Sequence, residues 1–401
     1  MLLVCYLAGC ASSTKPQATD YRLRAQQQER GEIRVSAVVL SAGEALHHFQ
    51  LPMEKQGIQP IWISIRNGGQ SELVLQLLSV DPDYFAPSEV AWRLRKRSSL
   101  SFEALQQQLL EQHIPVVIPA GQTLSGFVFT NEDPGAKAFS IELFGEQVYH
   151  SFEFAQLVPG LEADFVRVDF EKLYPAEQYR ELDREAFRQY LQALPCCTLG
   201  GDQRSDGDPL NLVIVGDGRH LLATLVRRGW DLTETLHRGS AWRTVRSSLF
   251  GAQYRTSPVS PLYLFDRAQD FALQKTRSNV DERNHLRLWL APVTVDGQPV
   301  WLGQISRDIG IKFSSKTLVT HKIDPVIDEA RLYITLDLVA SRYLAAVGYV
   351  EGVGRASWED PKFNYTKDPY FTDGLRVVLF LAPSPTALGD IDFLSWATPG
   401  L

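Results

Sequence analysis

Residues 284–324 read NHLRLWLAPVTVDGQPVWLGQISRDIGIKFSSKTLVTHKID and decide the fold of the second half of the chain. Two runs in which apolar and polar residues alternate flank Asp296-Gly297, a dipeptide typical of a two-residue type I′ turn. A tight turn there places Val295 opposite Gln298 and sets the register of both strands. The stretch therefore predicts a long antiparallel β-hairpin.

Side chains alternate between the two faces of a sheet, so the predicted register assigns each residue to a face. Trp289 falls opposite Gln304, Arg287 opposite Ser306 and His285 opposite Asp308. The polar face then carries His285, Arg287, Trp289, Gln304, Ser306 and Asp308. The apolar face carries Leu286, Leu288, Leu290, Ile305 and Ile309. The hairpin thus predicts an imidazole beside a carboxylate.

A helix is predicted at 325–340, because Asp324 suits an N-cap and Pro325 a first helical turn. Asp328 and Arg331 lie one turn apart in it. We expect these residues to gather with those of the polar face. The hypothetical catalytic groups are His285, Asp308 and His321, and the binding groups are Arg287, Lys322, Asp324, Asp328 and Arg331.

The region 208–385 is predicted to be an α+β domain with a mainly antiparallel sheet, and 386–401 a tail. Strands are expected at 210–216, 261–265, 270–275, 343–352 and 375–382, and helices at 219–230 and 240–251. The turn 215–219 matches neither a Gly-x-Gly-x-x-Gly nor a P-loop, so we expect no nucleotide cofactor.

Residues 31–168 alternate in short segments separated by Gly, Pro, Asn and Asp, which favours an N-terminal β-sandwich. Strands are expected at 33–40, 61–67, 73–80, 125–131, 139–144 and 150–155, with a helix inserted at 101–112. Ile-Arg-Asn-Gly-Gly at 65–69, followed by Ile-Pro-Ala-Gly-Gln-Thr at 118–123, resembles immunoglobulin-like modules of envelope proteins.

Residues 169–207 are predicted to connect the two domains through an amphipathic helix that Pro195 ends, followed by a Gly- and Asp-rich loop. Tyr179, Leu182, Ala186, Tyr190 and Leu194 would line its apolar face. Cys196 and Cys197 are adjacent, and adjacent cysteines rarely reach unstrained disulfide geometry, so a buried or partly buried pair of thiols is expected. No cysteine spacing indicates a metal site.

The N-terminal residues resemble a targeting signal. Leu7-Ala8-Gly9-Cys10 follows an apolar start and resembles the lipobox of bacterial lipoproteins, which implies that Cys10 is lipidated. Residues 1–30 would then be signal and tether, and Ala11 after the anchor implies the periplasmic face of the outer membrane. The leader has no Lys or Arg and is shorter than the usual ~15–30 residues, so either the start lies upstream or the match is fortuitous.

Composition narrows the class of protein. The chain has 401 residues, 44% hydrophobic and 22% charged, which is typical of folded domains and long enough for more than one. Its net charge of −7 offers no footprint for nucleic acid. We expect membrane attachment through the lipid, and possible contacts with other envelope proteins.

Several motifs in the second half resemble, in order, the LssY C-terminal domain family: Asp208–Gly216, Pro258–Phe265, Arg283–Trp289, Ser306–Gly310 and Thr320–Pro325 with Asp328 and Arg331. The resemblance covers about 208–382. In some relatives this domain is attached to a membrane phosphatase of the type 2 phosphatidic-acid phosphatase class. Its Arg-Pro and Pro-Ser-Gly-His motifs are absent from this sequence, and the family implies no reaction.

Two functions remain open. In the first, the protein is a cell-envelope lipoprotein with a binding or structural role, and the charged residues form a buried network in which every partner is needed. In the second, it is an envelope hydrolase acting on phosphoesters or lipid-linked substrates, with His285 as base, Asp308 as its orienter and His321 as acid. A metal held by these residues and Asp324 is a variant of the second.

Overall fold

The computed structural model describes residues 20–133, 135–159, 168–233, 259–276, 283–314 and 318–399, without the side chains of 171 and 311–321. The helix predicted at 240–251 and the anchor Cys10 lie outside these residues. The chain divides into two compact units, one formed by 1–132 with 141–152 and the other by 133–140 with 153–401. Within the described residues, no helix is long and apolar enough to cross a bilayer.

The N-terminal half is built on two four-stranded sheets, ordered β1-β2-β3-β6 and β5-β4-β7-β8. The strands of the first are β1 Gln26–Arg30, β2 Ile33–Val39, β3 Ile58–Asn67 and β6 Thr123–Asn131, all antiparallel. Those of the second are β4 Leu73–Gln76, β5 Val117–Ile118, β7 Ala136–Gly145 and β8 Val148–Leu157. Helices α1 Ala42–Phe49, α2 Leu77–Val80, α3 Pro87–Leu94 and α4 Phe102–Gln112 complete it.

Five of the six expected strands and the inserted helix are confirmed here. The strand predicted at 73–80 is wrong in its second half, because it turns into α2 after Gln76. Helix α1 was missed, although its signal is local: the Ser41 hydroxyl accepts from Glu44 N while the Glu44 carboxylate accepts from Ser41 N, a capping box.

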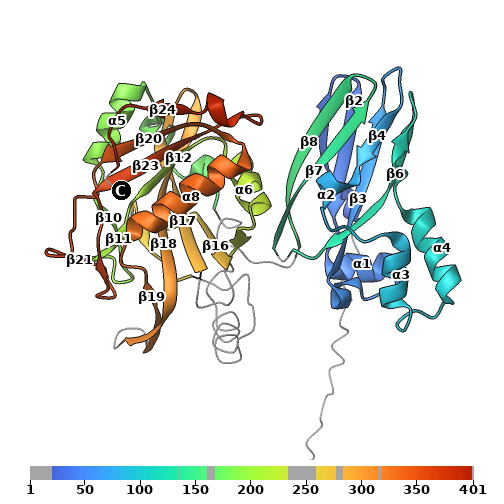
Figure 1. Ribbon diagram of the computed structural model, residues 1–401, viewed down its shortest axis with the longest axis horizontal. Coiled ribbons are helices and arrows are strands. Elements are labelled where there is room, and N and C mark those ends of the chain that lie inside the picture. The colour runs from blue at the N-terminus through green and yellow to red at the C-terminus, as the bar shows by residue number, and fades with distance from the viewer. Residues whose placement is uncertain are drawn as a thin grey trace, which may run out of the picture. The chain divides into compact units, whose positions relative to one another are not determined.

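The C-terminal unit is organised by a ten-stranded mixed sheet, with β13-β16-β17-β18-β12-β23-β20-β24 in order, β19 beside β18 and β9 beside β17 (Figure 1). Its strands are β9 Arg180–Leu182, β12 Leu212–Val215, β13 Asp231–Leu232, β16 Phe271–Thr276, β17 Arg283–Val295, β18 Gln298–Ser314, β19 Leu318–Ile323, β20 Leu344–Glu351, β23 Leu375–Leu381 and β24 Asp392–Leu394. The β12–β23, β20–β24 and β17–β9 pairs are parallel and the others antiparallel.

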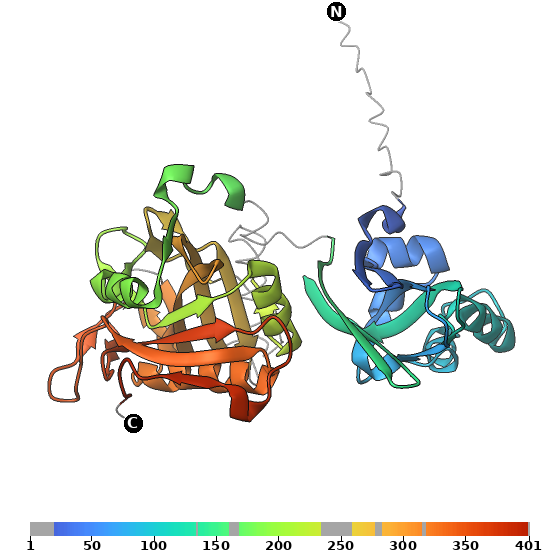
Figure 2. The ribbon, with the colours of Figure 1, turned by 90° about the horizontal axis from the view of Figure 1, so that it is seen from above.

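Helices cover both faces of this sheet. On one face, α6 Gly218–Arg227 and α8 Ile327–Ser341 pack against a cluster that includes Leu286, Leu288 and Ile305. The other face is covered by α5 Arg184–Ala193 (Figure 2). Its Phe187 and Leu191 belong to a second buried cluster. A small sheet of β10 Cys197–Leu199, β11 Asp206–Pro209, β14 Tyr263–Leu264 and β15 Arg267–Ala268, and the pair β21 Lys362–Phe363 and β22 Pro369–Tyr370, complete the unit.

The connecting helix differs from its prediction. It begins only after Asp183, whose side chain accepts from Ala186 N, because residues 180–182 extend to pair with β17. Its fully buried residues are Phe187 and Leu191, so the apolar face is centred about one residue away from the one expected. Its C-terminal end is held by Arg376, a fully buried side chain.

The expectation of two thiols is also wrong: Cys196 and Cys197 are joined in a disulfide. Cys196 lies in a bend immediately before β10, and Cys197 is the first residue of that strand. The alternation that separates neighbouring side chains within a strand therefore does not apply to this pair, and the two sulfur atoms meet.

The hairpin has the predicted turn. Asp296 and Gly297 take left-handed backbone angles, with φ of 52° and 71°, and Val295 pairs with Gln298. The register shifts between Thr294 and Leu290, so that Leu290 pairs with Trp301. Pro292 lies in this irregular segment and has no N–H to donate to a ladder.

Candidate functional site

The register shift changes the partner of His285 but not its face. His285 lies opposite Ser306 rather than Asp308, and Arg287 lies opposite Gln304. Because the shift amounts to two residues, every side chain stays on its predicted face. Asp308 therefore reaches His285 diagonally, and its Oδ2 is 2.5 Å from His285 Nε2. The predicted contact is present, although the predicted pairing is wrong.

His285 and Asp308 lie in an enclosed network with the guanidinium of Arg283. Exposed fractions are 5% for His285, 4% for Asp308 and 3% for Arg283. Arg283 Nε is 3.0 Å from His285 Nε2 and 3.7 Å from Asp308 Oδ2, and its Nη1 donates to Gln274 Oε1 at 2.5 Å. Burial, and then the charges of Arg283 and Arg287, hold the pKa of His285 well below 6.5. The imidazole is thus neutral at pH 7, and its Nε2 lies between the Asp308 carboxylate and the Arg283 guanidinium.

Arg287 lies on the same face but turns to other partners. Its Nη1 donates to Gln304 Oε1 at 2.7 Å and its Nε to Ser260 O at 3.2 Å. Burial lowers the pKa of Arg287, and the charges of Asp208 and Asp308 oppose this effect. Burial raises the pKa of Asp208 in turn, which Arg287 opposes. Asp208 is a member of this buried network that the sequence did not single out.

The residues after β18 do not join the cluster as predicted. Asp324 is not the N-cap, because α8 begins at Ile327; its Oδ1 accepts instead from Val326 N at 3.0 Å. Lys322 is exposed on β19. The His321 side chain lies outside the described residues, so its assignment as acid, or as a ligand in the metal variant, stays a prediction.

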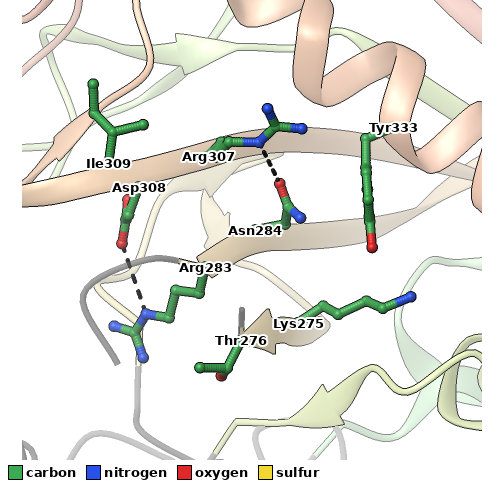
Figure 3. Close-up of a pocket in the computed structure, with 8 residues that line it drawn as sticks. All are labelled: Lys275, Thr276, Arg283, Asn284, Arg307, Asp308, Ile309 and Tyr333. Atoms are coloured by element: carbon green, nitrogen blue, oxygen red, sulfur yellow. Dashed lines mark hydrogen bonds and ion pairs between the residues drawn. The ribbon is translucent and has the colours of Figure 1, made fainter. Parts of the chain in front are cut away.

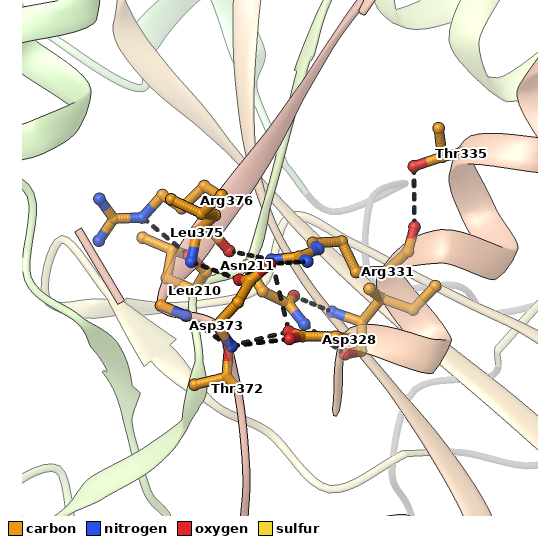
Figure 4. A network of polar contacts seen from close by, with 11 residues as sticks. Leu210, Asn211, Asp328, Arg331, Thr335, Thr372, Asp373, Leu375 and Arg376 are labelled. Atoms are coloured by element: carbon orange, nitrogen blue, oxygen red, sulfur yellow. Dashed lines mark hydrogen bonds and ion pairs between the residues drawn. The ribbon is translucent and has the colours of Figure 1, made fainter. Parts of the chain in front are cut away.

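Asp328 and Arg331 form a separate network at the start of α8 (Figure 4). Arg331 donates from Nη1 and Nη2 to the two carboxylate oxygens of Asp373, each at 2.7 Å, and from Nη1 to Leu375 O. Asp328 accepts from Thr372 Oγ1 and Asp373 N, both at 2.8 Å. These bonds bind the first turn of α8 to the segment before β23, on the opposite face of the sheet from His285.

A pocket of about 280 Å³ opens where β16, β17 and β18 meet α8 (Figure 3). Its described lining consists of Lys275, Thr276, Arg283, Asn284, Arg307, Asp308, Ile309 and Tyr333. Asp308 links it to the His285 network, while His285 and Ser306 are not among these lining residues. Sequence reasoning missed six of them, although Asn284 and Arg307 stand as polar residues at the open end of the predicted apolar face.

Two of the motifs that resembled a known family contribute to this pocket. Arg283–Trp289 begins β17 and supplies Arg283 and Asn284 of the lining, and Ser306–Gly310, in the second half of β18, supplies Arg307, Asp308 and Ile309. The family model described as LssY C-terminus matches residues 188–375. Residues 188–375 form an LssY C-terminal domain. The match begins inside α5, about twenty residues before the expected start at 208. No curated protein matches the chain.

In the LssY C-terminal domain, the groups that could act in catalysis and the groups that could bind a ligand lie in different surroundings. The neutral imidazole of His285 is committed to Asp308 through Nε2, and it lies behind the described lining of the pocket rather than in it. Besides the Asp308 carboxylate and the apolar Ile309, the described lining offers three cations, an amide, a hydroxyl and a phenol. Such groups donate hydrogen bonds and attract negative charge, so this part of the domain is suited to hold an anion.

Proposed function

We propose that the protein is a cell-envelope lipoprotein whose LssY C-terminal domain binds a ligand rather than transforming it. One observation supports this proposal. Asp308 and three cations line the pocket, whereas the imidazole of His285, on the other side of Asp308, is enclosed and is not among the described lining residues. A general base must reach the proton that it removes, directly or through one water. His285 is better placed to stabilise the domain.

A stability measurement with an activity screen tests the assignment. His285→Ala breaks a buried charged network, for which we expect a loss of about 3 kcal/mol, or roughly 6–12 °C in melting temperature for a unit of this size. His47→Ala, an exposed histidine, is the matched control. The wild-type chain should hydrolyse no phosphoester, carboxylate ester or glycoside above the blank.

A hydrolase is the second candidate, and the 2.5 Å contact between His285 and Asp308 favours it, because base and orienter stand together. It predicts turnover by the wild-type chain that Asp308→Asn abolishes while the melting temperature changes little. That result would replace the binding assignment.

The envelope location is part of the proposal. Cys10, in Leu7-Ala8-Gly9-Cys10, would carry the lipid, with the polar segment after it as tether to the periplasmic face of the outer membrane. Cys10→Ser should move the full chain from the membrane to the soluble fraction. Continued membrane sedimentation of this variant in high salt would contradict the anchor.

We propose that the N-terminal half is an immunoglobulin-like β-sandwich that contacts other envelope proteins. Support comes from a contact between its two sheets: the Arg30 guanidinium of β1 lies 5.7 Å from the centre of the Phe152 ring of β8. The inward residues of both sheets, such as Val35 and Ile141, are fully buried.

A further inference from the structure

Two cations of the pocket are held in place by one aromatic ring. Tyr333 of α8 has Lys275 Nζ 5.5 Å from its ring centre and the Arg307 guanidinium carbon 5.7 Å from it. Arg307 Nε donates to Asn284 Oδ1 at 3.2 Å, which orients the guanidinium further (Figure 3). Lys275 Nζ is 3.1 Å from both carboxylate oxygens of Asp337. The positive groups are therefore positioned before any ligand arrives, which lowers the entropy cost of binding.

Arg307 keeps donors for a ligand. Its Nε is used on Asn284, and its nearest carboxylate among the described residues, Asp324, lies 4.0 Å from Nη1, beyond hydrogen-bond distance. The two terminal nitrogens together offer four N–H groups in a planar fork. That geometry matches two oxygens of a phosphate or carboxylate.

The charge and size of the pocket narrow the ligand. The described lining holds three cations, Lys275, Arg283 and Arg307, and one carboxylate, Asp308, so it carries a formal charge of three minus one, or +2, in a chain whose net charge is −7. Asp337, which pairs with Lys275 from outside the lining, is itself balanced by Arg228. A phosphate monoester carries about −1.5 to −2 near pH 7 and balances that excess. The volume of about 280 Å³ lies at the lower end of the usual ~300–1,000 Å³ range, which suits a small group rather than a whole large ligand.

We propose that this pocket is a phosphate site that binds a phosphate monoester group through Arg307, Lys275 and Arg283. The inference rests on the proposed binding function and deepens it by naming the ligand chemistry. The phosphate can be free or can belong to a lipid headgroup, and the contacts would be the same in both cases.

The test compares three full-length proteins: wild type, Arg307→Gln, and Arg219→Gln as a control. Arg219 is an exposed arginine of α6 outside the pocket lining. Calorimetric titration uses inorganic phosphate, and sedimentation uses phosphatidylcholine vesicles with or without phosphatidic acid. Thermal melting without ligand shows whether each variant is folded. If Arg307→Gln does not fold, Arg307→Lys takes its place.

We expect wild type and Arg219→Gln to bind phosphate equally, Arg307→Gln to bind at least about tenfold more weakly, and affinity to fall as salt is raised. Binding of inorganic phosphate indicates a soluble source, and binding only of phosphatidic acid vesicles indicates a headgroup. Equal affinity of Arg307→Gln, or no binding in either arm, overturns the phosphate site.

Two further outcomes separate this inference from the proposed function. If succinate binds in an Arg307-dependent manner and phosphate does not, the phosphate site is wrong and the binding module stands. If the wild-type chain hydrolyses a phosphate monoester and Arg307→Gln does not, the phosphate site stands and the non-catalytic assignment fails.

Discussion

Replacement of Arg376 should strongly destabilise the C-terminal unit. It lies on β23, is 0% exposed, and donates to five backbone carbonyls in place of a carboxylate. Nε donates to Leu210 O at 2.8 Å (Figure 4), Nη1 to Leu191 O, and Nη2 to the carbonyls of Leu194, Pro195 and Gly352. Three of these carbonyls belong to the C-terminal end of α5 and the residues that follow, where a helix leaves its last carbonyls unsatisfied.

The cost of Arg376→Met can be worked from these bonds. Hydrogen bonds to a charged group contribute about 1.5 kcal/mol each at the low end, so five contribute roughly 7 kcal/mol. Burial lowers the pKa of Arg376 from 12.5 to about 10, and at about 1.36 kcal/mol per pKa unit this is roughly 3 kcal/mol of unfavourable charge burial. The net loss should be about 4 kcal/mol, a large part of the ~5–15 kcal/mol that stabilises a typical domain.

Urea unfolding of the full chain, with amide hydrogen exchange of residues 184–194, measures this loss. Exchange in α5 should accelerate more than in α8. Arg342→Met is the matched control, because Arg342 is exposed and Nε donates to one carbonyl, that of Thr386; it should cost under about 1 kcal/mol. A loss under 1 kcal/mol for Arg376→Met, or unchanged exchange in α5, would refute the reasoning.

Two other networks give independent predictions. His285 has a folded pKa below its unfolded value of about 6.5, so its neutral form stabilises the fold above pH 6.5, and stability should fall as the pH drops below it, by at most ~1.4 kcal/mol per pH unit. Urea midpoints between pH 5 and 8 should show a weaker slope for His285→Asn than for wild type, and equal slopes would contradict the shift. Arg331→Met leaves Asp373 and Asp328 without their cation and should cost about 3–5 kcal/mol, against a smaller loss for Asp373→Asn. Thermal melting of both variants checks this, and similar losses would mean that the buried charge is not what matters.

Much of the hairpin could be predicted because its signals are local. A two-residue Asp-Gly turn needs positive φ at both positions, and Asp296 and Gly297 supply it. The alternation of residues then assigns faces, and it survived the register shift near Pro292 because an even shift preserves the face. The contact of His285 with Asp308 followed from the faces alone, although the exact pairing did not.

The pocket could not be predicted in the same way. Asn284 and Arg307 lie on the face that the sequence marks as apolar. They line a pocket only because the end of β16 and Tyr333 of α8 lie beside them in the folded unit. Asp328 and Arg331 were expected near His285, yet α8 packs on the other face of the sheet, where Asp373 meets them.

The sequence by itself determined the tight turn, the face of each hairpin residue and the family of the C-terminal domain, because these depend on neighbours along the chain. Only the tertiary structure decided which charges meet. Arg331 and Arg376 have partners that are distant in the sequence: Asp373 lies 42 residues from Arg331, and Leu191 lies 185 residues from Arg376. No local pattern encodes such a pairing, since it depends on the order in which distant strands join the sheet and on the face that each helix covers.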